Sequence, residues 1–212
     1  IEVKAPHDEQ VHIGTWLYGM PDDHMPQVQG NLMVTGAAFQ TTKGQARETI
    51  GTGPSATTSD TGKYKVTGIE LGVAGNVTDK LSLWGGATVI NSEILESADA
   101  ANLGMEFANI AHEQFNLLAK YQVTDKLSIG GQATWRGKIQ GGTFAASNDN
   151  ELPSYWRLDA MADYEIRENA SLSFRVDNLT DELYYDAFYR SATPYVYVAP
   201  GRSVSLSLKM KF

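Results

Sequence analysis

Three absences bound what this 212-residue sequence can be. It contains no cysteine, which excludes disulfide bonds and thiolate metal ligands. It has no apolar run of about 18 residues, so no transmembrane helix is predicted. Basic residues are outnumbered, at 17 Lys and Arg against 25 Asp and Glu, and they form no basic stripe. We therefore expect no nucleic-acid partner.

Motifs for catalysis and metal binding are also missing. The four histidines show neither HxH nor HExxH spacing, and no serine lies in a GxSxG elbow. Carboxylates such as Asp159, Asp163 and Glu165 recur at the spacing of one strand face, which favours contacts with neighbouring strands over acid–base catalysis. We predict that the protein is not an enzyme and has no catalytic residue, no metal site and no cofactor.

What the sequence does contain is a repeated hexapeptide. VTDKLS occurs at residues 77–82 and 123–128, and a looser copy, IRENASLSF, begins at Ile166. Around the second copy, apolar and polar residues alternate, over residues 115–121 before it and 127–135 after it. Alternation with a period of two predicts β-strands, so each copy is interpreted as the tight turn of a hairpin.

The same alternation predicts an all-β chain of nine antiparallel strands. These cover residues 9–19, 31–48, 63–77, 80–96, 110–122, 127–140, 155–166, 171–186 and 202–212. Stretches rich in Gly, Pro, Ser, Thr and Asn separate some of the strands and are predicted to be long loops. These loops are residues 50–62, 97–109, 141–154 and 187–201. Short turns at one end and long loops at the other indicate an up-and-down meander with two unlike ends.

Alternation alone does not choose between a soluble β-fold and a membrane barrel. On the apolar parity, however, Trp156 and Tyr164 lie near opposite ends of one strand, about 26 Å apart along it, or about 20 Å of height when the strand tilts. The other parity carries charged residues such as Arg157 and Asp159, which suits a wet lumen. The chain also ends on one apolar face, formed by Val204, Leu206, Leu208, Met210 and Phe212. These features favour an antiparallel transmembrane β-barrel that meets outer-membrane lipid.

Nine strands do not make a complete barrel of the bacterial type. Bacterial single-chain barrels have an even number of strands, with both ends on the periplasmic side. An open sheet would also leave hydrogen-bonding groups unsatisfied in lipid. We therefore expect the C-terminal part of a larger barrel at residues 31–212. Residues 1–30, which include PDDHMPQVQG, fit least well and are assigned to a strand and a connector.

Three motifs carry a family resemblance: GKYKVTGIELGV at 62–73, RVDNLTDELYY at 175–185 and APGRSVSLSLKMKF at 199–212. In order and spacing they resemble the closing strands of TonB-dependent outer-membrane receptors, particularly those for catecholate siderophores. The resemblance implies a barrel of about 22 strands, of which these are the last nine. It also implies an N-terminal plug, absent from this sequence, that engages TonB. The terminal Phe212 then belongs to the signal read by the barrel-assembly machinery.

The function implied by this resemblance is to bind a ferric siderophore outside the cell and import it with energy from TonB. A ferric tris-catecholate is a large aromatic trianion, so its site should offer cations and ring faces at the outer mouth. Iron enters only as part of this ligand. The predicted ligand-binding residues are Arg136, Lys138, Tyr155 and Arg157 on neighbouring strands, and Tyr185, Phe188, Tyr189, Arg190, Tyr195 and Tyr197 in the last long loop. Each has a structural alternative, because loop tyrosines pack loop against loop and lumen arginines pair with carboxylates.

Two other functions fit an outer-membrane barrel. A passive porin would need an unplugged lumen with a charged constriction, and a barrel enzyme would need a catalytic cluster above the membrane. A plug with a TonB box upstream of these strands would decide for the receptor.

Overall fold

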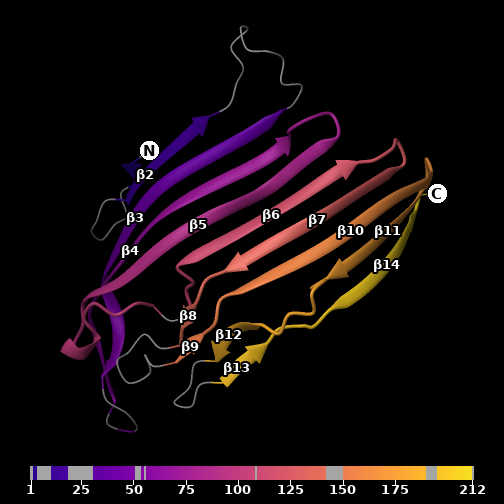
Figure 1. The fold of residues 1–212 in the computed structure, drawn as a ribbon. Helices are drawn as coiled ribbons and strands as arrows, with labels where there is room; N and C mark the ends of the chain where they lie inside the picture. The colour runs from indigo at the N-terminus through magenta and orange to yellow at the C-terminus, as the bar shows by residue number, and fades with distance from the viewer. Residues whose placement is uncertain are drawn as a thin grey trace.

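Ten antiparallel strands form one continuous, curved sheet (Figure 1). The computed structural model describes residues 2–3, 11–18, 31–50, 54, 56–107, 109–141, 150–189 and 195–211, with the backbone alone for residues 2–3, 11–18, 50 and 189. In spatial order the strands are β1 (Glu2–Val3), β2 (Val11–Tyr18), β3 (Leu32–Ile50), β4 (Thr57–Asn76), β5 (Leu81–Glu96), β6 (Glu113–Gln122), β7 (Leu127–Arg136), β10 (Tyr155–Arg167), β11 (Ala170–Asp177) and β14 (Ser203–Met210). Spatial order follows chain order, so the sheet is an up-and-down meander.

Smaller elements lie at the long-loop end of the sheet (Figure 1). Strand β8 (Ile139–Gln140) pairs with β9 (Glu151–Leu152), and β12 (Tyr185–Tyr189) pairs with β13 (Tyr195–Val198). One turn of 3-10 helix, η2, covers Ala100–Asn102. Within the described residues, no helix has the length and apolar character needed to cross a membrane.

The two VTDKLS copies fold as the same tight turn, as predicted. In the first copy, the Val77 N–H donates to the Leu81 carbonyl over 2.8 Å. The Thr78 hydroxyl accepts a hydrogen bond from the Leu81 N–H over 3.0 Å. The second copy repeats both bonds, at 2.8 and 3.1 Å, around Thr124. The repeat therefore encodes a turn that a threonine side chain closes in the same way each time.

The predicted strand ends differ from the observed ones at the long-loop end. Strand β3 continues to Ile50 and β4 begins at Thr57, so the predicted loop 50–62 is too long. The β-branched residues at its end extend the ladder, because Thr49 pairs with Thr58 and Ile50 with Thr57. Strand β11 ends at Asp177 rather than at residue 186, because the chain leaves the main sheet there.

One further predicted strand boundary differs from the structure, and the assignment near the N-terminus is tested only in part. The predicted strand 127–140 ends at Arg136, and residues 139–140 pair with β9 outside the main sheet. Near the N-terminus, β2 pairs with β3. Residues 19–30 lie outside the described part of the chain, so the assignment of residues 1–30 to a strand and a connector stays a prediction.

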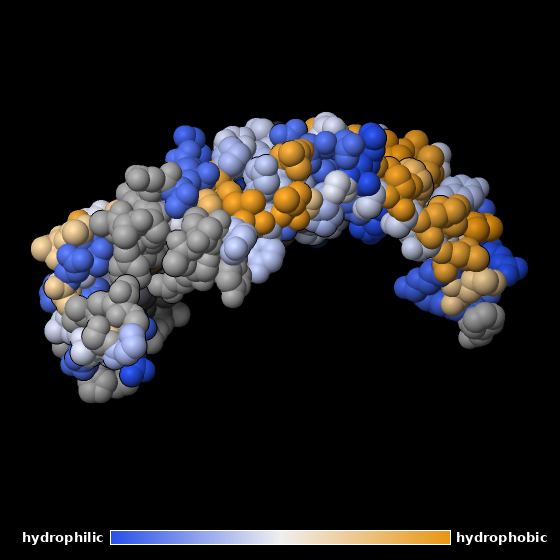
Figure 2. Space-filling view, turned by 90° about the horizontal axis from the view of Figure 1, so that it is seen from below, coloured by the Kyte–Doolittle hydropathy of each residue, from blue (hydrophilic) through white to orange (hydrophobic). Residues whose placement is uncertain are grey.

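The strand register places the predicted apolar parity on one face of the sheet. Ala162 lies opposite Ile129 on one side and Phe174 on the other, and Phe174 lies opposite Leu206. Leu206 is 66% exposed, although the face it belongs to is apolar. Figure 2 shows the sheet as an arc, with patches of apolar side chains between polar ones. A broad exposed apolar face of this kind is expected where a barrel wall meets lipid.

Aromatic side chains mark both edges of this apolar face. At the long-loop end, the Trp156 ring packs against those of Trp135 and Phe115, with centroids 5.2 and 6.0 Å apart. At the short-turn end, the exposed rings of Tyr121 and Tyr164 lie on the same face. Aromatic belts at both membrane interfaces are typical of outer-membrane barrels.

The outer edge of the apolar face is also visible on β4 and β5. There Ile69 lies opposite Val89, and four residues further out Lys65 lies opposite Glu93 on the same face. The Lys65 ammonium and Glu93 carboxylate form a 2.7 Å ion pair. Because charges are costly in hydrocarbon, the bilayer ends between these two pairs. The outer parts of β3 and β4 therefore rise beyond the membrane.

The orientation of β14 gives a testable prediction. We expect Leu206→Arg to destabilise the folded barrel by about 2 to 4 kcal/mol, because the side chain would face lipid near mid-strand. Ser207→Arg is the matched control, since residue 207 lies on the polar face opposite Ser173 and near the Asp163 carboxylate. Urea unfolding of the complete barrel in lipid vesicles measures both. Equal losses of stability, or a larger loss for Ser207→Arg, would contradict the assignment of the two faces.

Candidate functional site

The predicted cationic residues meet at the long-loop end, on the concave face of the arc. In the register, Arg136 lies opposite Tyr155, and Arg157 is two residues along β10 from Tyr155. Neighbours in a strand point to opposite faces. Because Trp135 and Trp156 are on the convex face, Arg136, Tyr155 and Arg157 belong to the concave face. The structure therefore brings this part of the predicted set together.

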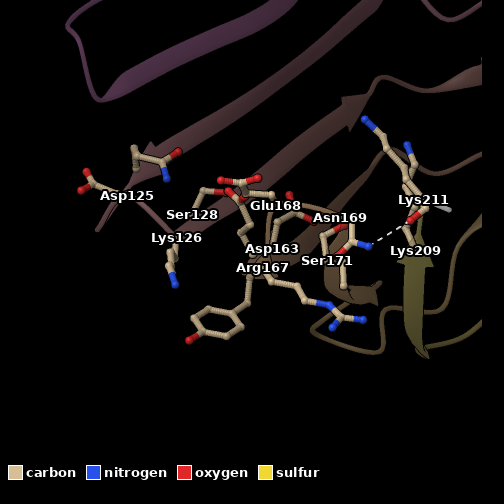
Figure 3. Close-up of a pocket in the computed structure, with 14 residues that line it drawn as sticks. Asp125, Lys126, Ser128, Asp163, Arg167, Glu168, Asn169, Ser171, Lys209 and Lys211 are labelled. Carbon is tan, nitrogen blue, oxygen red and sulfur yellow. Dashed lines mark hydrogen bonds between the residues drawn. The ribbon is translucent and has the colours of Figure 1, made fainter.

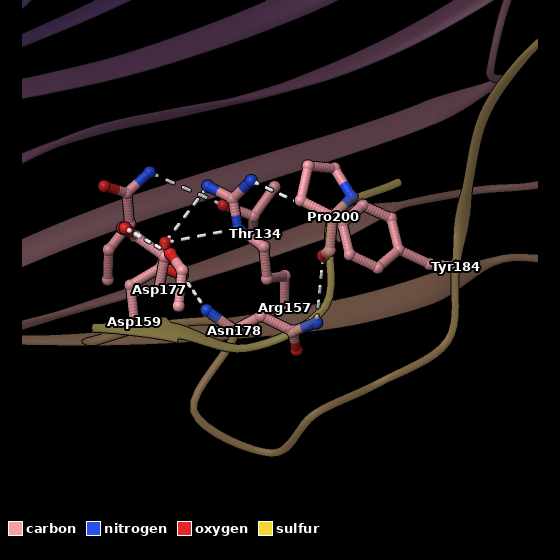
Figure 4. Close-up of polar contacts among 9 residues, drawn as sticks. Thr134, Arg157, Asp159, Asp177, Asn178, Tyr184 and Pro200 are labelled. Atoms are coloured by element: carbon pink, nitrogen blue, oxygen red, sulfur yellow. Dashed lines mark hydrogen bonds and ion pairs between the residues drawn. The ribbon is translucent and has the colours of Figure 1, made fainter. Parts of the chain in front are cut away.

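Arg157 is held by protein groups on two sides (Figure 4). Its Nε and Nη2 donate to Oδ2 of the buried Asp159 over 3.2 and 3.0 Å. Its Nη1 donates to the Tyr184 hydroxyl over 3.5 Å. The Tyr184 ring stacks on that of Tyr155, with centroids 4.4 Å apart. The charge of Arg157 is thus compensated by a carboxylate within the wall.

Lys138, just beyond β7, is also compensated. Its ammonium forms a 2.8 Å ion pair with the Glu151 carboxylate of β9. The hydrogen bond with Glu151 raises the pKa of Lys138, so the lysine stays charged. Its side chain is largely exposed, and a pair of this kind is weak because water screens it.

Arg136 differs from the other two cations because it meets no carboxylate. Its Nη1 donates over 2.6 Å to the backbone carbonyl of Asp186, at the start of the last outer hairpin. Its Nε is buried and has no hydrogen-bond partner. Within the described part of the chain, Arg136 forms no ion pair. An uncompensated guanidinium near the outer mouth is the feature of the site that most favours an anion.

Two of the predicted aromatic residues pack loop against loop. Phe188 is 8% exposed and sits in a small apolar cluster, and Tyr185 packs against it. The other members of the cluster are Ala111, Ile139 and Leu152. The Phe188 N–H also donates to Asn109 Oδ1 over 3.0 Å. This cluster ties the β8–β9 and β12–β13 hairpins together at the mouth.

The other predicted aromatic residues of this loop are exposed or lie outside the described residues. Tyr195 and Tyr197 lie on one face of β13 and are 64% and 54% exposed. The side chain of Tyr189 and the whole of Arg190 lie outside the described residues. Ligand contact by any member of the predicted set stays a prediction.

A hydrogen-bonded junction below the last hairpin was not foreseen. The Asn178 side chain, 1% exposed, accepts from the Glu182 N–H over 2.9 Å and donates to the carbonyls of Glu182 and Pro200 over 2.9 and 3.4 Å. The Asn178 N–H donates to Asp159 Oδ1 over 2.8 Å. Asp181 Oδ1 accepts from the Arg202 N–H over 2.9 Å. We call these bonded residues the Asn178 junction, of which Figure 4 labels Asn178, Asp159 and Pro200.

The junction explains two of the motifs that carry the family resemblance. RVDNLTDELYY supplies Asn178 and Asp181, and APGRSVSLSLKMKF supplies Pro200 and Arg202. Asn178 and Asp181 have positive φ values of 52° and 57°. Asn and Asp tolerate this backbone better than other side chains, because they bond their own backbone in tight turns. An N-L-T-D sequence that follows a strand was the available signal for such a turn.

The short-turn end of the sheet has a separate, polar pocket of about 330 Å³ (Figure 3). Its walls come from the 123–126 turn, the turn before β11 and the end of β14. Asp163 in this wall accepts from Lys120 Nζ over 2.8 Å and from the Ser173 hydroxyl over 2.7 Å. The Asn169 amide donates to the Lys211 carbonyl over 3.1 Å. These bonds join neighbouring strands, so the carboxylate has a structural partner.

His112, in the segment that leads into β6, is surrounded by acceptors. Its Nε2 lies 2.8 Å from Glu106 Oε2, and its Nδ1 lies 3.1 Å from the Ile90 carbonyl and 3.2 Å from Asn91 Oδ1. The hydrogen bond with Glu106 is the main cause that raises the pKa of His112. The protonated ring can donate on both sides and so ties the 97–109 loop to β5. No group of three or more potential metal ligands occurs among the described residues.

Comparison with known proteins gives consistent matches. Residues 27–179 match the family described as TonB dependent receptor-like, beta-barrel. The chain is 30% identical to the probable TonB-dependent receptor BfrD of Bordetella pertussis, over 100% of this chain and 28% of that protein. It is 30% identical to the catecholate siderophore receptor Fiu of Escherichia coli K12, over 85% of this chain and 24% of that protein. The chain thus spans about a quarter of the length of these curated relatives.

Solved structures agree with the sequence matches. The siderophore receptor PiuA from Acinetobacter baumannii superposes with a TM-score of 0.81 at 30% identity, over 96% of this chain and 28% of that one. The ferric-catecholate import receptor Fiu from E. coli K12, in its closed form, gives 0.75 at 26% identity over 96% and 28%. These proteins are named as receptors, not enzymes. The predicted fold class, a section of a transmembrane β-barrel, is confirmed.

The His112 contacts predict a pH-dependent stability. The pKa of His112 in the folded state is raised above the ordinary value of about 6.5. The stability that its protonated ring contributes is therefore fully present below about pH 6.5 and is lost as pH rises through the folded-state pKa. Denaturant unfolding at several pH values should show this loss in the wild type and not in His112→Gln. Identical pH profiles for the two proteins would contradict the assignment.

Proposed function

The chain belongs to the TonB-dependent receptor family, and on that premise we propose that it forms part of the wall of a receptor that imports a ferric siderophore with energy from TonB. Receptors of this family lie in the outer membrane of Gram-negative bacteria, and so does this chain. Two similar proteins are named as siderophore receptors, which supports siderophore as the cargo. Iron is cargo in this proposal, and no resident cofactor is invoked.

The observation that carries the proposal is the uncompensated Arg136 at the outer mouth, beside exposed tyrosines. A ferric catecholate presents negative charge and aromatic rings together. Arg136 offers charge-assisted hydrogen bonds to the oxygens, and Tyr195 and Tyr197 offer ring faces. Arg157 and Lys138 already hold carboxylates, so they contribute less net attraction. We therefore propose a catecholate as the siderophore class.

Among the described cations of the site, removing the uncompensated charge of Arg136 should weaken ligand binding most. Arg136→Gln keeps much of the side-chain volume and removes an interaction of about 1.5 to 3 kcal/mol, so Kd for a ferric tris-catecholate should rise about tenfold or more. The on-rate should fall and lose part of its salt dependence. Stopped-flow fluorescence with the complete receptor measures both quantities.

Lys138→Gln is the matched control for this substitution. It removes a charge from the same rim, but one that Glu151 already compensates, so its effect on Kd should be several-fold smaller. If neither substitution changes affinity or salt dependence, the cations of this rim have structural roles, and recognition lies elsewhere on the receptor.

Transport itself is tested in cells. A strain that carries the complete receptor should accumulate iron from its ferric siderophore, with saturable uptake that stops when TonB is deleted. A panel of ferric catecholates and hydroxamates then identifies the preferred class. Uptake that is unsaturable and independent of TonB would instead identify a passive porin.

We also propose that Phe212 is part of the signal read by the barrel-assembly machinery, although this residue lies outside the described part of the chain. Deleting Phe212 should reduce the amount of folded receptor in the outer membrane and leave the ligand affinity of the surviving molecules unchanged. Heat-modifiable mobility on gels measures the folded fraction. A normal folded yield would rule out this role.

A further inference from the structure

The Asn178 junction holds both ends of the last outer hairpin. On the entering side, the Asn178 side chain makes two hydrogen bonds with the backbone of Glu182. On the leaving side, it donates to the Pro200 carbonyl. Between these points, the Ala199 N–H donates to the Tyr184 carbonyl over 3.0 Å and closes the base of the hairpin. One buried amide thus connects two chain segments about twenty residues apart.

The β12–β13 hairpin in turn carries groups of the proposed binding site. The Asp186 carbonyl accepts the hydrogen bond that orients the Arg136 guanidinium. Phe188 packs into the loop cluster, and Tyr195 and Tyr197 are exposed on β13. The position of this hairpin therefore determines the positions of the Arg136 guanidinium and of the Tyr195 and Tyr197 rings.

Asp159 connects the Asn178 junction to Arg157 on the concave face of the sheet. Its Oδ1 accepts from the Asn178 N–H over 2.8 Å, and its Oδ2 accepts from Arg157 Nη2 over 3.0 Å. Asp159 is buried, so water competes little for these bonds. A single carboxylate holds both the junction and a cation of the concave face in position (Figure 4).

We propose that Asn178 and Asp159 are positioning residues for ligand recognition, which act by holding the β12–β13 hairpin where it orients Arg136. The inference rests on the proposed function for its ligand, but the hold on the hairpin is a separate property. It also assigns a role to the NLTD and APGR motifs, whose residues touch no ligand in this scheme.

The test uses Asn178→Gly in the complete receptor. Glycine keeps the positive φ without steric cost, so the substitution removes only the amide. Losing three hydrogen bonds of a buried group should speed hydrogen–deuterium exchange in residues 184–199 about tenfold or more. Kd for a ferric tris-catecholate should rise by a similar factor, while the heat-modifiable mobility of the barrel stays unchanged.

Two further variants separate positioning from general stability. Asn169→Gly removes an exposed amide from the turn at the other end of β11, where it makes one hydrogen bond, to the Lys211 carbonyl, and should alter neither exchange in the hairpin nor Kd. Asp181→Gly also keeps a positive φ, removes the exposed bond to Arg202, and should act as Asn178→Gly does, with a smaller effect.

Coupling to Arg136 gives the decisive readout. If Asn178 acts through Arg136, the Asn178→Gly effect on Kd should be several-fold smaller in an Arg136→Gln background. Three outcomes would each overturn the inference. The first is unchanged exchange and affinity in both Asn178→Gly and Asp181→Gly, and the second is an equally large effect of Asn169→Gly. The third is a double variant whose Kd rises by the product of the factors for Asn178→Gly and Arg136→Gln. The wild-type receptor could bind no ferric siderophore while Asn178→Gly still speeds exchange in the hairpin. That result would overturn the proposed function and support the role of Asn178 in holding the hairpin.

Discussion

Backbone hydrogen bonding in hydrocarbon is the constraint on which the rest of this structure depends. Lipid offers no partner for an N–H or a carbonyl, so a chain that crosses the bilayer as strands needs each one paired with a neighbour. The long antiparallel ladders from β3 to β14 meet this demand along the wall. Pairing in turn imposes the period of two, and the period separates a convex apolar face from a concave polar one.

The two ends of the wall differ from its middle because the need for backbone pairing in hydrocarbon ends at the bilayer surfaces. At the short-turn end, Thr78 and Thr124 close minimal turns with their hydroxyls. At the outer end, strands leave the bilayer, and the convex face changes from apolar pairs to the Lys65–Glu93 ion pair. There, side chains such as Asn109 and Asn178 form the hydrogen bonds with backbone N–H and carbonyl groups that a continuous ladder forms elsewhere. This freedom from regular pairing lets the outer end build a specific mouth.

The sequence was informative wherever the period of two was unbroken. It predicted the nine long strands, both threonine turns and the face of Phe174 and Leu206. It failed where side chains replace the ladder. The predicted strand ran on to residue 186, but Asn178 takes a positive φ and turns the chain away after Asp177. The N-L-T-D sequence was the local signal for that turn, but it does not show which distant groups the Asn178 side chain bonds.

The candidate site divides in the same way. Parity correctly grouped Arg136, Tyr155 and Arg157 on one face, because parity is a local property. It did not reveal which cations are compensated. The bond from Arg136 to Asp186 joins residues 50 positions apart, and it depends on how the last hairpin lies. Such partners are decided by tertiary placement. The sequence therefore offered ten equal candidates, whereas the structure shows which of the described cations among them, Arg136, Lys138 and Arg157, has no carboxylate partner.

The central claim, that this chain is a membrane wall with a lipid face and a lumen face, is open to a direct measurement. A nitroxide is attached to a single cysteine introduced at each residue of β10, Tyr155–Arg167, in turn, in the receptor reconstituted in bilayers. Collision rates with oxygen, which partitions into lipid, and with a water-soluble nickel chelate are then compared. The account predicts a period of two, with oxygen favoured at even positions such as Leu158 and Ala162 and nickel at odd ones. No alternation, or alternation of the opposite phase, would contradict it.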